Sequence, residues 1–317
     1  MSRIRARISF AFIIFTLQQW TLSALTAGAA RYAIDLPPQL GSEPEKPPLR
    51  ASVVVVSHNR VALLRRCLES LEKSERRETL QLIVVDNGSR DGSARLDSEF
   101  PNVQFIRLPK NFGLTKALNL GWRAADTDYA LFLHDDTEVE PQTVLGLADV
   151  LDANADAVAV CPLLVDEEGR SAPQLGSLPP DGQWHPAEPS GDEPQPVRYA
   201  RGAALMARVF FVKAIRQIDE RYGQFGSDAD LAAQIIKAGR KILLAPKLRV
   251  RHQGKRGYTQ AEEADFLLGR AVFMQKYRGI GAGVQARLAA VLGPLAGLRL
   301  GQMRYTLVGQ KIDGTQP

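Results

Sequence analysis

Runs of apolar residues alternate with amphipathic segments between residues 51 and 278. The first run, 52–56, is rich in valine and has no polar alternation, which is typical of a strand buried on both faces of a parallel sheet. Similar runs predict strands at 80–85, 103–108, 129–133, 157–164, 241–245 and 248–251. Leucines at helical spacing predict a helix at 63–71, and further helices are expected at 114–125, 144–151, 203–212, 228–238 and 261–277. Strands and helices in alternation, joined by short connections, predict an α/β fold with a mostly parallel sheet flanked by helices.

The segments before residue 51 differ in composition from this region. Residues 1–34 hold four arginines, no acidic residue and an uncharged stretch from 8 to 30. Three interpretations of that stretch stay open: a signal peptide, a signal anchor, or an extension that the folded domain does not need. Residues 35–50 hold five prolines and show neither a strand nor a helix period, so we expect a linker.

Two later segments also stand apart. Residues 169–197 are rich in Pro, Gly and acidic residues, and a loop of this length is usually functional or disordered. Residues 279–317 predict a basic amphipathic helical tail with a kink at Pro294. Such a tail fits a membrane interface and fits plain packing against the domain equally well.

Charge is unevenly distributed along the chain. The net charge is +5, but residues 237–258 carry eight basic residues and no acid, whereas the middle of the chain is acidic. Because a nucleic-acid binder spreads basic residues over the domain itself, we expect no nucleic-acid partner. Basic later segments suit a phosphate ligand or contact with an anionic membrane surface. The two cysteines lie far apart with no CxxC, which excludes a disulfide framework and a cysteine-based zinc site.

Polar clusters follow three of the predicted strands, at 57–60, 86–89 and 134–137. Each cluster alone fits an ordinary turn or helix cap. The carboxyl ends of parallel strands meet at one rim of a sheet, however, so the three clusters together predict a site there. Two adjacent carboxylates, Asp135 and Asp136, suit Mg²⁺ or Mn²⁺ held together with substrate phosphates. The sequence has neither a GxxxxGK[ST] nor a GxGxxG motif, so a metal and basic side chains would have to hold those phosphates.

Five segments in order resemble the motifs of the family 2 glycosyltransferases, inverting enzymes with the GT-A (Rossmann-like) fold. They are SVVVVSHNR (52–60), IVVDNGSRD (83–91), NFGLTKALNLG (111–121), LHDDTEVEP (133–141), and FGSDADL (225–231), the last followed by VRHQG (250–254). One such string is a weak signal, but five in the right order are specific. The resemblance implies a GT-A domain over residues 51–278, followed by the C-terminal helical tail.

The resemblance also implies roles for residues on the nucleotide side. Ser57 and Asn59 would line the nucleotide pocket. Asp86 would accept a hydrogen bond from the base, with Asn87 beside it. Lys116 would belong to a loop and helix that close over the nucleotide.

At the reacting end, the resemblance implies that Asp135 lies toward the ribose and that Asp136 binds the metal. His252 matches a histidine near the diphosphate that is a metal ligand in some relatives. Asp228 matches the general base that removes the proton of the acceptor hydroxyl, and Asp230 competes with it for that role. Ser227 stands where the family usually has a glutamate that helps to place the acceptor.

The resemblance implies a metal-dependent inverting glycosyltransferase, and the Asp135–Asp136 motif and the NFG segment look most similar to its rhamnosyltransferase-like branch. Its cofactor would be Mg²⁺ or Mn²⁺, its donor dTDP-rhamnose or a UDP-hexose, and its acceptor a glycan or a lipid-linked saccharide. The alternative is a catalytically weak member that binds glycans, which Ser227 favours. A sugar nucleotidyltransferase would need a Gly-rich basic loop after the first strand, and the chain has none there. Because bacterial nucleotide sugars are cytosolic, we expect a cytoplasmic domain that is peripheral on the inner face of the membrane.

Overall fold

The computed structural model describes residues 47–179, 183–254 and 257–308. The expectations for residues 1–34 and for most of the proline-rich linker fall outside these ranges. So do two basic residues of the 237–258 segment, at 255 and 256, and the last nine residues of the predicted tail.

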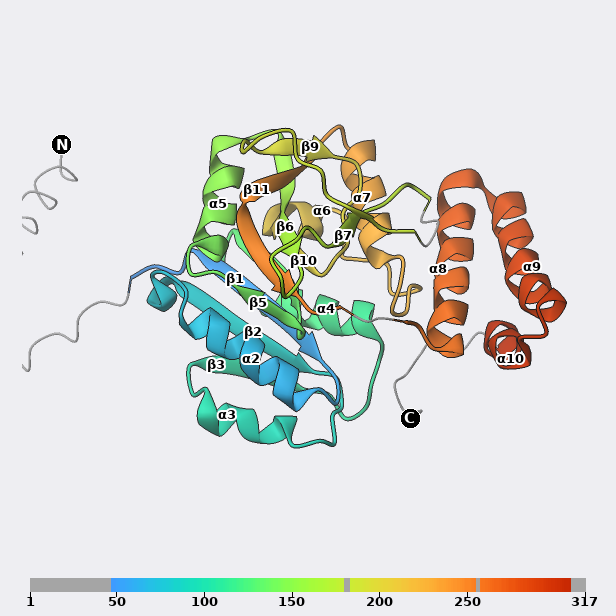
Figure 1. The fold of residues 1–317 in the computed structure, drawn as a ribbon, viewed down its shortest axis with the longest axis horizontal. Helices are drawn as coiled ribbons and strands as arrows, with labels where there is room; N and C mark the ends of the chain where they lie inside the picture. Colours follow the sequence, from blue (N-terminus) through green and yellow to red (C-terminus); the bar gives the residue numbers. More distant parts are fainter. Residues whose placement is uncertain (1–46, 180–182, 255–256, 309–317) are drawn as a thin grey trace, which may run out of the picture. The chain divides into compact units, whose positions relative to one another are not determined.

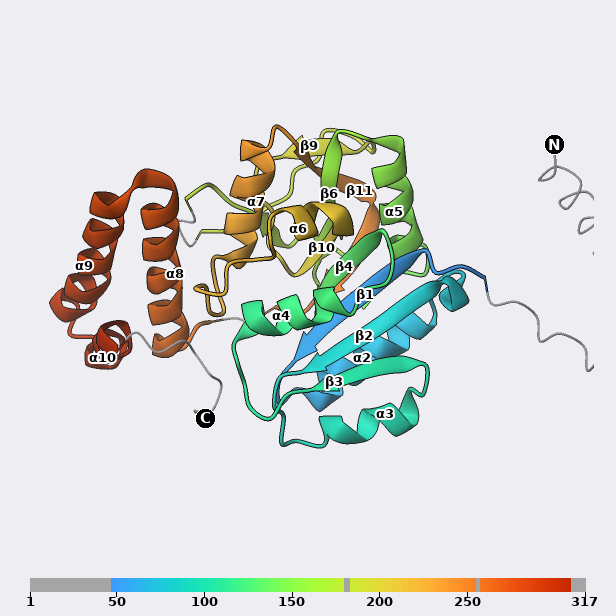
Figure 2. The same cartoon turned by 180° about the vertical axis from the view of Figure 1, so that it is seen from behind.

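A nine-stranded sheet forms the centre of the described chain, as Figures 1 and 2 show. The strand order is β3-β2-β1-β4-β10-β6-β11-β5, with β9 paired to β11. Neighbouring strands from β3 to β4 are parallel, as are β6 and β11, whereas β10 runs antiparallel between β4 and β6. The strands are β1 (Ala51–Ser57), β2 (Leu80–Asp86), β3 (Val103–Arg107), β4 (Tyr129–His134), β5 (Thr137–Val139), β6 (Ala157–Val165), β9 (Gln195–Val197), β10 (Ala204–Arg208) and β11 (Lys241–His252). A separate two-stranded sheet pairs β7 (Pro173–Leu175) with β8 (His185–Pro186), inside the segment expected to be a loop.

Helices cover both faces of the sheet. Helix α2 lies in front of the sheet in Figure 1, and α4 lies in front of it in the reverse view of Figure 2. The helices are α2 (Val61–Glu72), α3 (Leu96–Glu99), α4 (Leu114–Arg123), α5 (Thr143–Ala153), α6 (Val209–Ala214), α7 (Ser227–Lys237), α8 (Gln260–Arg278), α9 (Ile280–Ala296) and α10 (Leu300–Val308). This arrangement confirms the expected α/β class with a mostly parallel, helix-flanked sheet and C-terminal helices.

Alternate residues of the central strand enter two separate cores. Val53 and Val55 of β1 pack in one core with α2 and α5, whereas Val54 and Val56 pack in the other with α4 and α7. Successive strand side chains point to opposite faces, so a strand with helices on both sides needs apolar residues at every position. This two-sided burial explains the unbroken valine run.

Two predictions from the apolar pattern were wrong. Residues 203–212 form strand β10 followed by the short helix α6, not one helix. Ala204, Leu205, Met206 and Ala207 are all buried, and a fully buried run has no polar face from which periodicity could distinguish a strand from a helix. The two strands expected at 241–245 and 248–251 are one strand, β11, with an irregularity in its pairing to β6 between Ala245 and Arg249.

The C-terminal helices α8, α9 and α10 pack against one another beside the sheet domain. Thr259 and Glu262 form a capping box that starts α8 by satisfying exposed backbone N–H groups. Phe273 of α8 belongs to the second core, which attaches this helix to the domain. Helix α9 contains Pro294 near its end and leaves a stripe of apolar side chains exposed.

Candidate active site

The pairing of β1 with β2 and β4 brings the three polar clusters to one rim, as predicted. Ser57 is paired with Asp86 on one side, and Val56 is paired with His134 on the other. The Ser57 hydroxyl donates a 2.8 Å hydrogen bond to Oδ2 of Asp135, which directly follows β4 in the chain. The first and fourth strand ends therefore share one hydrogen-bonded site.

A second pairing, which local sequence did not predict, brings His252 to the same place. After the turn at Asp135 and Asp136 the chain forms the short strand β5, which runs antiparallel to the end of β11. In this register His252 is paired with Thr137, and the Gln253 N–H donates to the backbone carbonyl of Asp136 at 3.1 Å. Residues more than a hundred positions apart are thereby fixed side by side.

His134, Asp136 and His252 form a cluster that fits a divalent metal ion. One potential ligand atom from each lies within 4.8 Å of the others. Oδ1 of Asp136 is buried and accepts no hydrogen bond, although His252 Nε2 is 3.4 Å away and His134 Nδ1 is 3.9 Å away. A buried anionic oxygen without a donor is costly, and a cation between it and the two imidazoles would satisfy it. The residues present therefore suit the metal expected from the sequence.

Arg60 partly neutralises the two carboxylates from the other side. Its Nη1 lies 2.7 Å from Oδ1 of Asp135 and 3.5 Å from Oδ2 of Asp136. Burial raises the pKa of Asp135, and the charge of Arg60 and the Ser57 hydroxyl oppose this increase without cancelling it. Burial acts in the same direction on Asp136, but the neighbouring imidazoles of His252 and His134 together with Arg60 hold its pKa well below the usual range. Asp136 is thus the carboxylate that stays ionised most readily.

The cleft above this cluster is lined by six of the nine predicted site residues: Ser57, Asn59, Asn87, Asp135, Asp136 and His252. Asn87 uses its amide to hold the next loop, accepting from the Phe112 N–H at 2.9 Å and donating to Asn111 Oδ1 at 2.8 Å. Asn59, with a positive φ of 52°, accepts from the Arg90 N–H at 2.7 Å. These two side chains therefore shape the rim of the cleft through hydrogen bonds to its loops.

Two predicted nucleotide residues do not line the cleft. Asp86 is buried below the turn that follows β2 and accepts a hydrogen bond from the Ser89 N–H at 2.9 Å. Lys116 is exposed on α4, where its ammonium lies 4.8 Å from the centre of the Phe112 ring. Neither side chain is therefore among the residues that line the cleft of Asp135 and Asp136.

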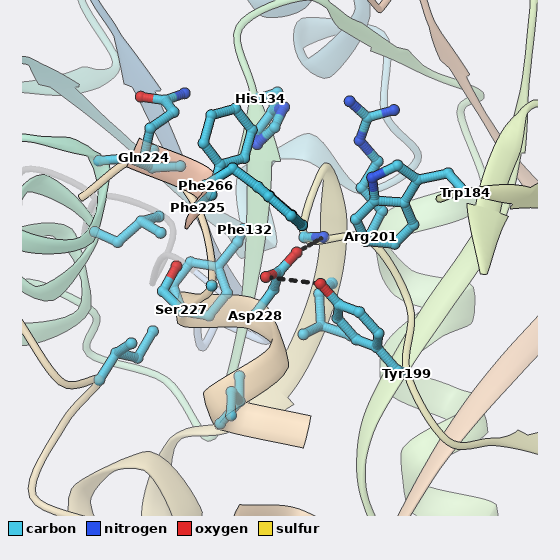
Figure 3. Close-up of a pocket in the computed structure, with 17 residues that line it drawn as sticks. Phe132, His134, Trp184, Tyr199, Arg201, Gln224, Phe225, Ser227, Asp228 and Phe266 are labelled. Atoms are coloured by element: carbon cyan, nitrogen blue, oxygen red, sulfur yellow. Dashed lines mark hydrogen bonds between the residues drawn. The ribbon is translucent and has the colours of Figure 1, made fainter. Parts of the chain in front are cut away.

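Asp228 lies in an adjoining pocket, shown in Figure 3. Its Oδ1 accepts from the Tyr199 hydroxyl and its Oδ2 from the Gly202 N–H, both at 3.1 Å. A Cβ atom at position 202 would lie 3.1 Å from Cβ of Asp228, so the glycine permits this close approach. Burial raises the pKa of Asp228, and the hydrogen bonds from Gly202, Ala229 and Tyr199 oppose the increase. A carboxylate with a raised pKa, open to a pocket, is suited to accept a proton.

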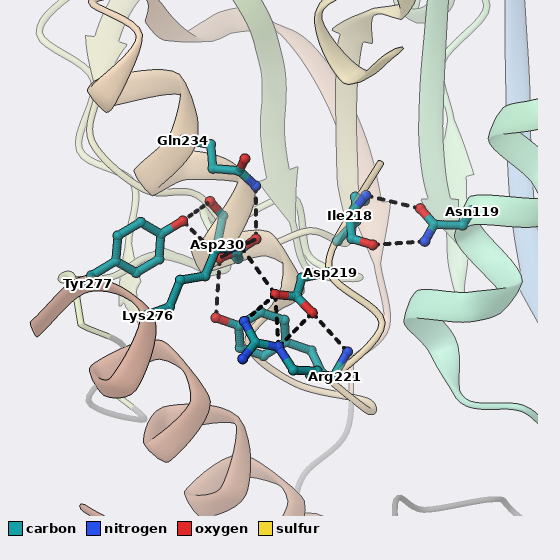
Figure 4. A network of polar contacts seen from close by, with 9 residues as sticks. Asn119, Ile218, Asp219, Arg221, Asp230, Gln234, Lys276 and Tyr277 are labelled. Atoms are coloured by element: carbon teal, nitrogen blue, oxygen red, sulfur yellow. Dashed lines mark hydrogen bonds and ion pairs between the residues drawn. The ribbon is translucent and has the colours of Figure 1, made fainter. Parts of the chain in front are cut away.

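Asp230, the competing base, is placed elsewhere. It is fully buried on the other side of α7, where it contacts Tyr222, Gln234, Lys276 and Tyr277 (Figure 4). Residues two apart on a helix point in nearly opposite directions, so Asp228 and Asp230 cannot both face the pocket. Geometry therefore favours Asp228, with Ser227 beside it in the pocket wall.

Four residues of the site were not assigned by sequence reasoning: Arg60, His134, Tyr199 and Arg201. His134 precedes Asp136 by two residues at the end of β4, a spacing that could have identified it as a further ligand. Tyr199 and Arg201 come from the segment before β10, and no local pattern links that segment to Asp228.

Comparison with known proteins identifies the family of this chain. Residues 52–210 match the sequence profile of glycosyl transferase family 2. The chain is 27% identical over 233 residues to the N-acetylglucosaminyl-diphospho-decaprenol L-rhamnosyltransferase of Mycobacterium tuberculosis, covering 63% of this chain and 75% of that protein. This relative confirms the expected likeness to the rhamnosyltransferase-like branch.

Two solved structures share the fold. The crystal structure of GalNAc-T7 with UDP, GalNAc and Mn²⁺ superimposes with a TM-score of 0.61 at 19% identity, over 73% of this chain and 48% of that one. Residues 1–349 of Staphylococcus aureus TarS in complex with UDP give a TM-score of 0.52 at 16% identity, over 72% and 66%. This chain thus spans about half of the GalNAc-T7 chain, and at these identities the likeness establishes the fold alone.

The profile match covers half of the sequence, and the chain therefore belongs to glycosyl transferase family 2.

Proposed function

We propose that this chain is a metal-dependent inverting glycosyltransferase, with residues 51–278 as its catalytic domain. It would move a sugar from a nucleoside diphosphate to a hydroxyl group of a glycan or lipid-linked acceptor. The observation that supports this most strongly is the adjacency of two pockets. One contains the His134, Asp136 and His252 cluster and the other contains Asp228, and His134 lines both.

The proposed reaction uses these pockets from opposite sides of the sugar. The acceptor oxygen forms a bond to the anomeric carbon, and its proton passes to Asp228. The bond from that carbon to the diphosphate oxygen breaks, and its electron pair leaves with the diphosphate. A divalent cation held by His134, Asp136 and His252 would supply positive charge to this leaving group. Arg60 favours the ionised form of both Asp135 and Asp136, and Tyr199 and Gly202 hold the carboxylate of Asp228 by hydrogen bonds.

The cluster favours Mn²⁺ over Mg²⁺ as the cofactor. Mg²⁺ binds oxygen ligands almost exclusively, whereas imidazole nitrogen suits transition metals. Two of the three candidate ligands are imidazoles. The GalNAc-T7 structure, which shares the fold, contains Mn²⁺.

The donor we propose is dTDP-rhamnose, with a UDP-hexose as the competing choice. The rhamnosyltransferase likeness supports the first, and the two solved structures that contain UDP support the second. The name of the mycobacterial relative describes an acceptor linked through diphosphate to a polyprenol. By analogy, we propose a lipid-linked saccharide acceptor for this chain.

Contact with a membrane surface would give access to such an acceptor. No helix within the described ranges is long and apolar enough to cross a bilayer. Helix α9 instead exposes a stripe that runs Ile280, Val284, Leu288, Leu292, Leu295. From residue 266 to 308 the chain has six basic residues and no acidic one. An apolar stripe in a segment of the chain that is basic in sequence suits the anionic face of a membrane, and we propose the cytoplasmic face because the donor is made there.

The experiment that tests this function measures nucleoside diphosphate release by the full-length chain. Donors would be dTDP-rhamnose, UDP-glucose, UDP-N-acetylglucosamine and a GDP-sugar, each with Mn²⁺ and a polyprenyl-diphosphate N-acetylglucosamine acceptor. We expect acceptor-dependent release with one donor, transfer with inversion, and a loss of about a hundredfold or more in Asp228→Asn. Nucleotide binding without release from any donor would favour the alternative of a weak, glycan-binding member.

A further inference from the structure

Arg201 lies at the junction between the two pockets of the site. It lines both the pocket of Asp228 and the cleft of Asp136, and Figure 3 shows it beside Trp184 above Asp228. None of the steps of the proposed reaction requires Arg201.

The position of Arg201 is fixed by contacts along its length. Its backbone N–H donates to the Gln174 carbonyl at 2.8 Å. Its guanidinium carbon lies 5.4 Å from the centre of the Trp184 ring, and its Nη2 donates to the Tyr258 hydroxyl at 3.0 Å. The next residue, Gly202, holds Asp228. A guanidinium has five N–H donors, and the contact with Tyr258 uses one of them, so the side chain is held in place with donors left for a ligand.

The charge of Arg201 helps to lower the pKa of Asp228, but within the described residues no carboxylate forms an ion pair with it. Arg60, the other arginine of the cleft, is paired with Asp135 and Asp136, whereas no acidic side chain in the described ranges forms an ion pair with Arg201. A surface arginine that stacks on an aromatic ring can be purely structural. Here, however, the stacked cation faces two pockets whose proposed ligands carry phosphates, and guanidinium matches phosphate oxygens in a bidentate geometry.

We infer that Arg201 binds the phosphate oxygens of a diphosphate at this junction. The inference rests on the proposed function, because it takes a nucleoside diphosphate sugar as donor. The diphosphate has two possible sources: the leaving group of the donor, or the diphosphate that links an acceptor sugar to its lipid. In the first case Arg201 stabilises the negative charge that develops when the bond to the anomeric carbon breaks and the electron pair moves to the diphosphate. In the second case it positions the acceptor hydroxyl against Asp228.

The test compares full-length wild type with Arg201→Gln, Arg201→Lys and the control Arg270→Gln. Arg270 is an exposed arginine on α8, so the control removes the same charge outside the site. Calorimetry with UDP and dTDP in the presence of Mn²⁺ tests whether the bound diphosphate belongs to the donor. A second assay tests whether it belongs to the acceptor. It compares the KM for N-acetylglucosamine linked through diphosphate to a short polyprenol with the KM for an uncharged N-acetylglucosaminide.

If the donor is the source, Arg201→Gln should bind the nucleoside diphosphate about ten- to a hundredfold more weakly than wild type, with Arg201→Lys between them. If the acceptor is the source, nucleotide affinity stays the same and the KM rises for the diphosphate-linked acceptor alone. Arg270→Gln should resemble wild type in both assays. Equal behaviour of wild type and Arg201→Gln in both assays would overturn the inference and leave the proposed function intact. Wild-type protein that binds no nucleotide would overturn the proposed function itself, and this inference with it.

Discussion

Tyr199→Phe isolates the hydrogen bond that tunes the proposed general base. The Tyr199 hydroxyl donates to Oδ1 of Asp228 at 3.1 Å and favours the ionised carboxylate over the neutral acid. Removing it therefore raises the pKa of Asp228 further above its ordinary value. Because the base acts when deprotonated, activity at acidic pH should fall.

The size of this effect follows from the other donors to Asp228. A hydrogen bond to a charged group contributes about 1.5–3 kcal/mol. The N–H groups of Gly202 and Ala229 remain after the substitution, at 3.1 and 2.8 Å, so the lower end of that range applies. A loss near 1.4 kcal/mol changes an equilibrium constant about tenfold.

The assay is the pH profile of kcat/KM for donor turnover. Where the pH is below the pKa of Asp228 in both proteins, kcat/KM of Tyr199→Phe should be about tenfold lower than that of wild type. At alkaline pH, where Asp228 is ionised in both, the two values of kcat/KM should be equal. Tyr129→Phe serves as the matched control, because it removes a hydrogen bond from a tyrosine hydroxyl to the carboxylate of Asp152, at the start of β4 and outside both pockets. If kcat/KM of Tyr199→Phe falls at the same acidic pH as that of wild type, Asp228 is not the titrating base.

Three further predictions concern the metal cluster, the buried network and the tail. His134→Ala should weaken Mn²⁺-dependent nucleotide binding by more than the roughly ten- to hundredfold loss typical of an outer-shell partner, as titration calorimetry would show; unchanged affinity would exclude it as a ligand. Asp230→Ala should lower the free energy of unfolding by about 1–3 kcal/mol in urea denaturation, because it leaves the buried Tyr222 hydroxyl without its acceptor, whereas the exposed Lys276 keeps Asp219; an unchanged free energy of unfolding would contradict this. Leu288→Glu with Leu292→Glu should abolish cosedimentation with anionic phospholipid vesicles at unchanged thermal stability, and a dimer that dissociates in this variant would identify the stripe as a protein interface.

Local sequence was sufficient to predict how β1 is buried and which residues lie at the carboxyl ends of the strands. The valine run of β1 predicted a strand buried on both faces, and the polar residues after β1 and β4 were expected to meet because parallel strands end at one rim. Ser57 and Asp135 are hydrogen-bonded there. Such features need no knowledge of distant pairing.

Contacts that depend on the pairing of strands far apart in the sequence, or on where a helix begins, could not be predicted in this way. His252 meets Asp136 because the short strand β5, which the apolar pattern did not predict, pairs with the end of β11. The choice between Asp228 and Asp230 depended on where α7 begins and which way each side chain points, and element boundaries are the least certain part of any sequence-based prediction. The apolar pattern predicts a helix where strand β10 lies, because the neighbouring strands bury β10 and leave it no polar face.

The most direct test of the central claim is the binding of UDP, GDP and dTDP to the full-length chain, measured by calorimetry with and without Mn²⁺. Wild type, Asp136→Ala and Asp228→Asn would be compared. We predict that one nucleotide binds wild type in a metal-dependent manner, that Asp136→Ala abolishes this binding, and that Asp228→Asn retains it, because the base is not a nucleotide ligand. Metal-independent binding, or binding that survives Asp136→Ala, would contradict the proposed site.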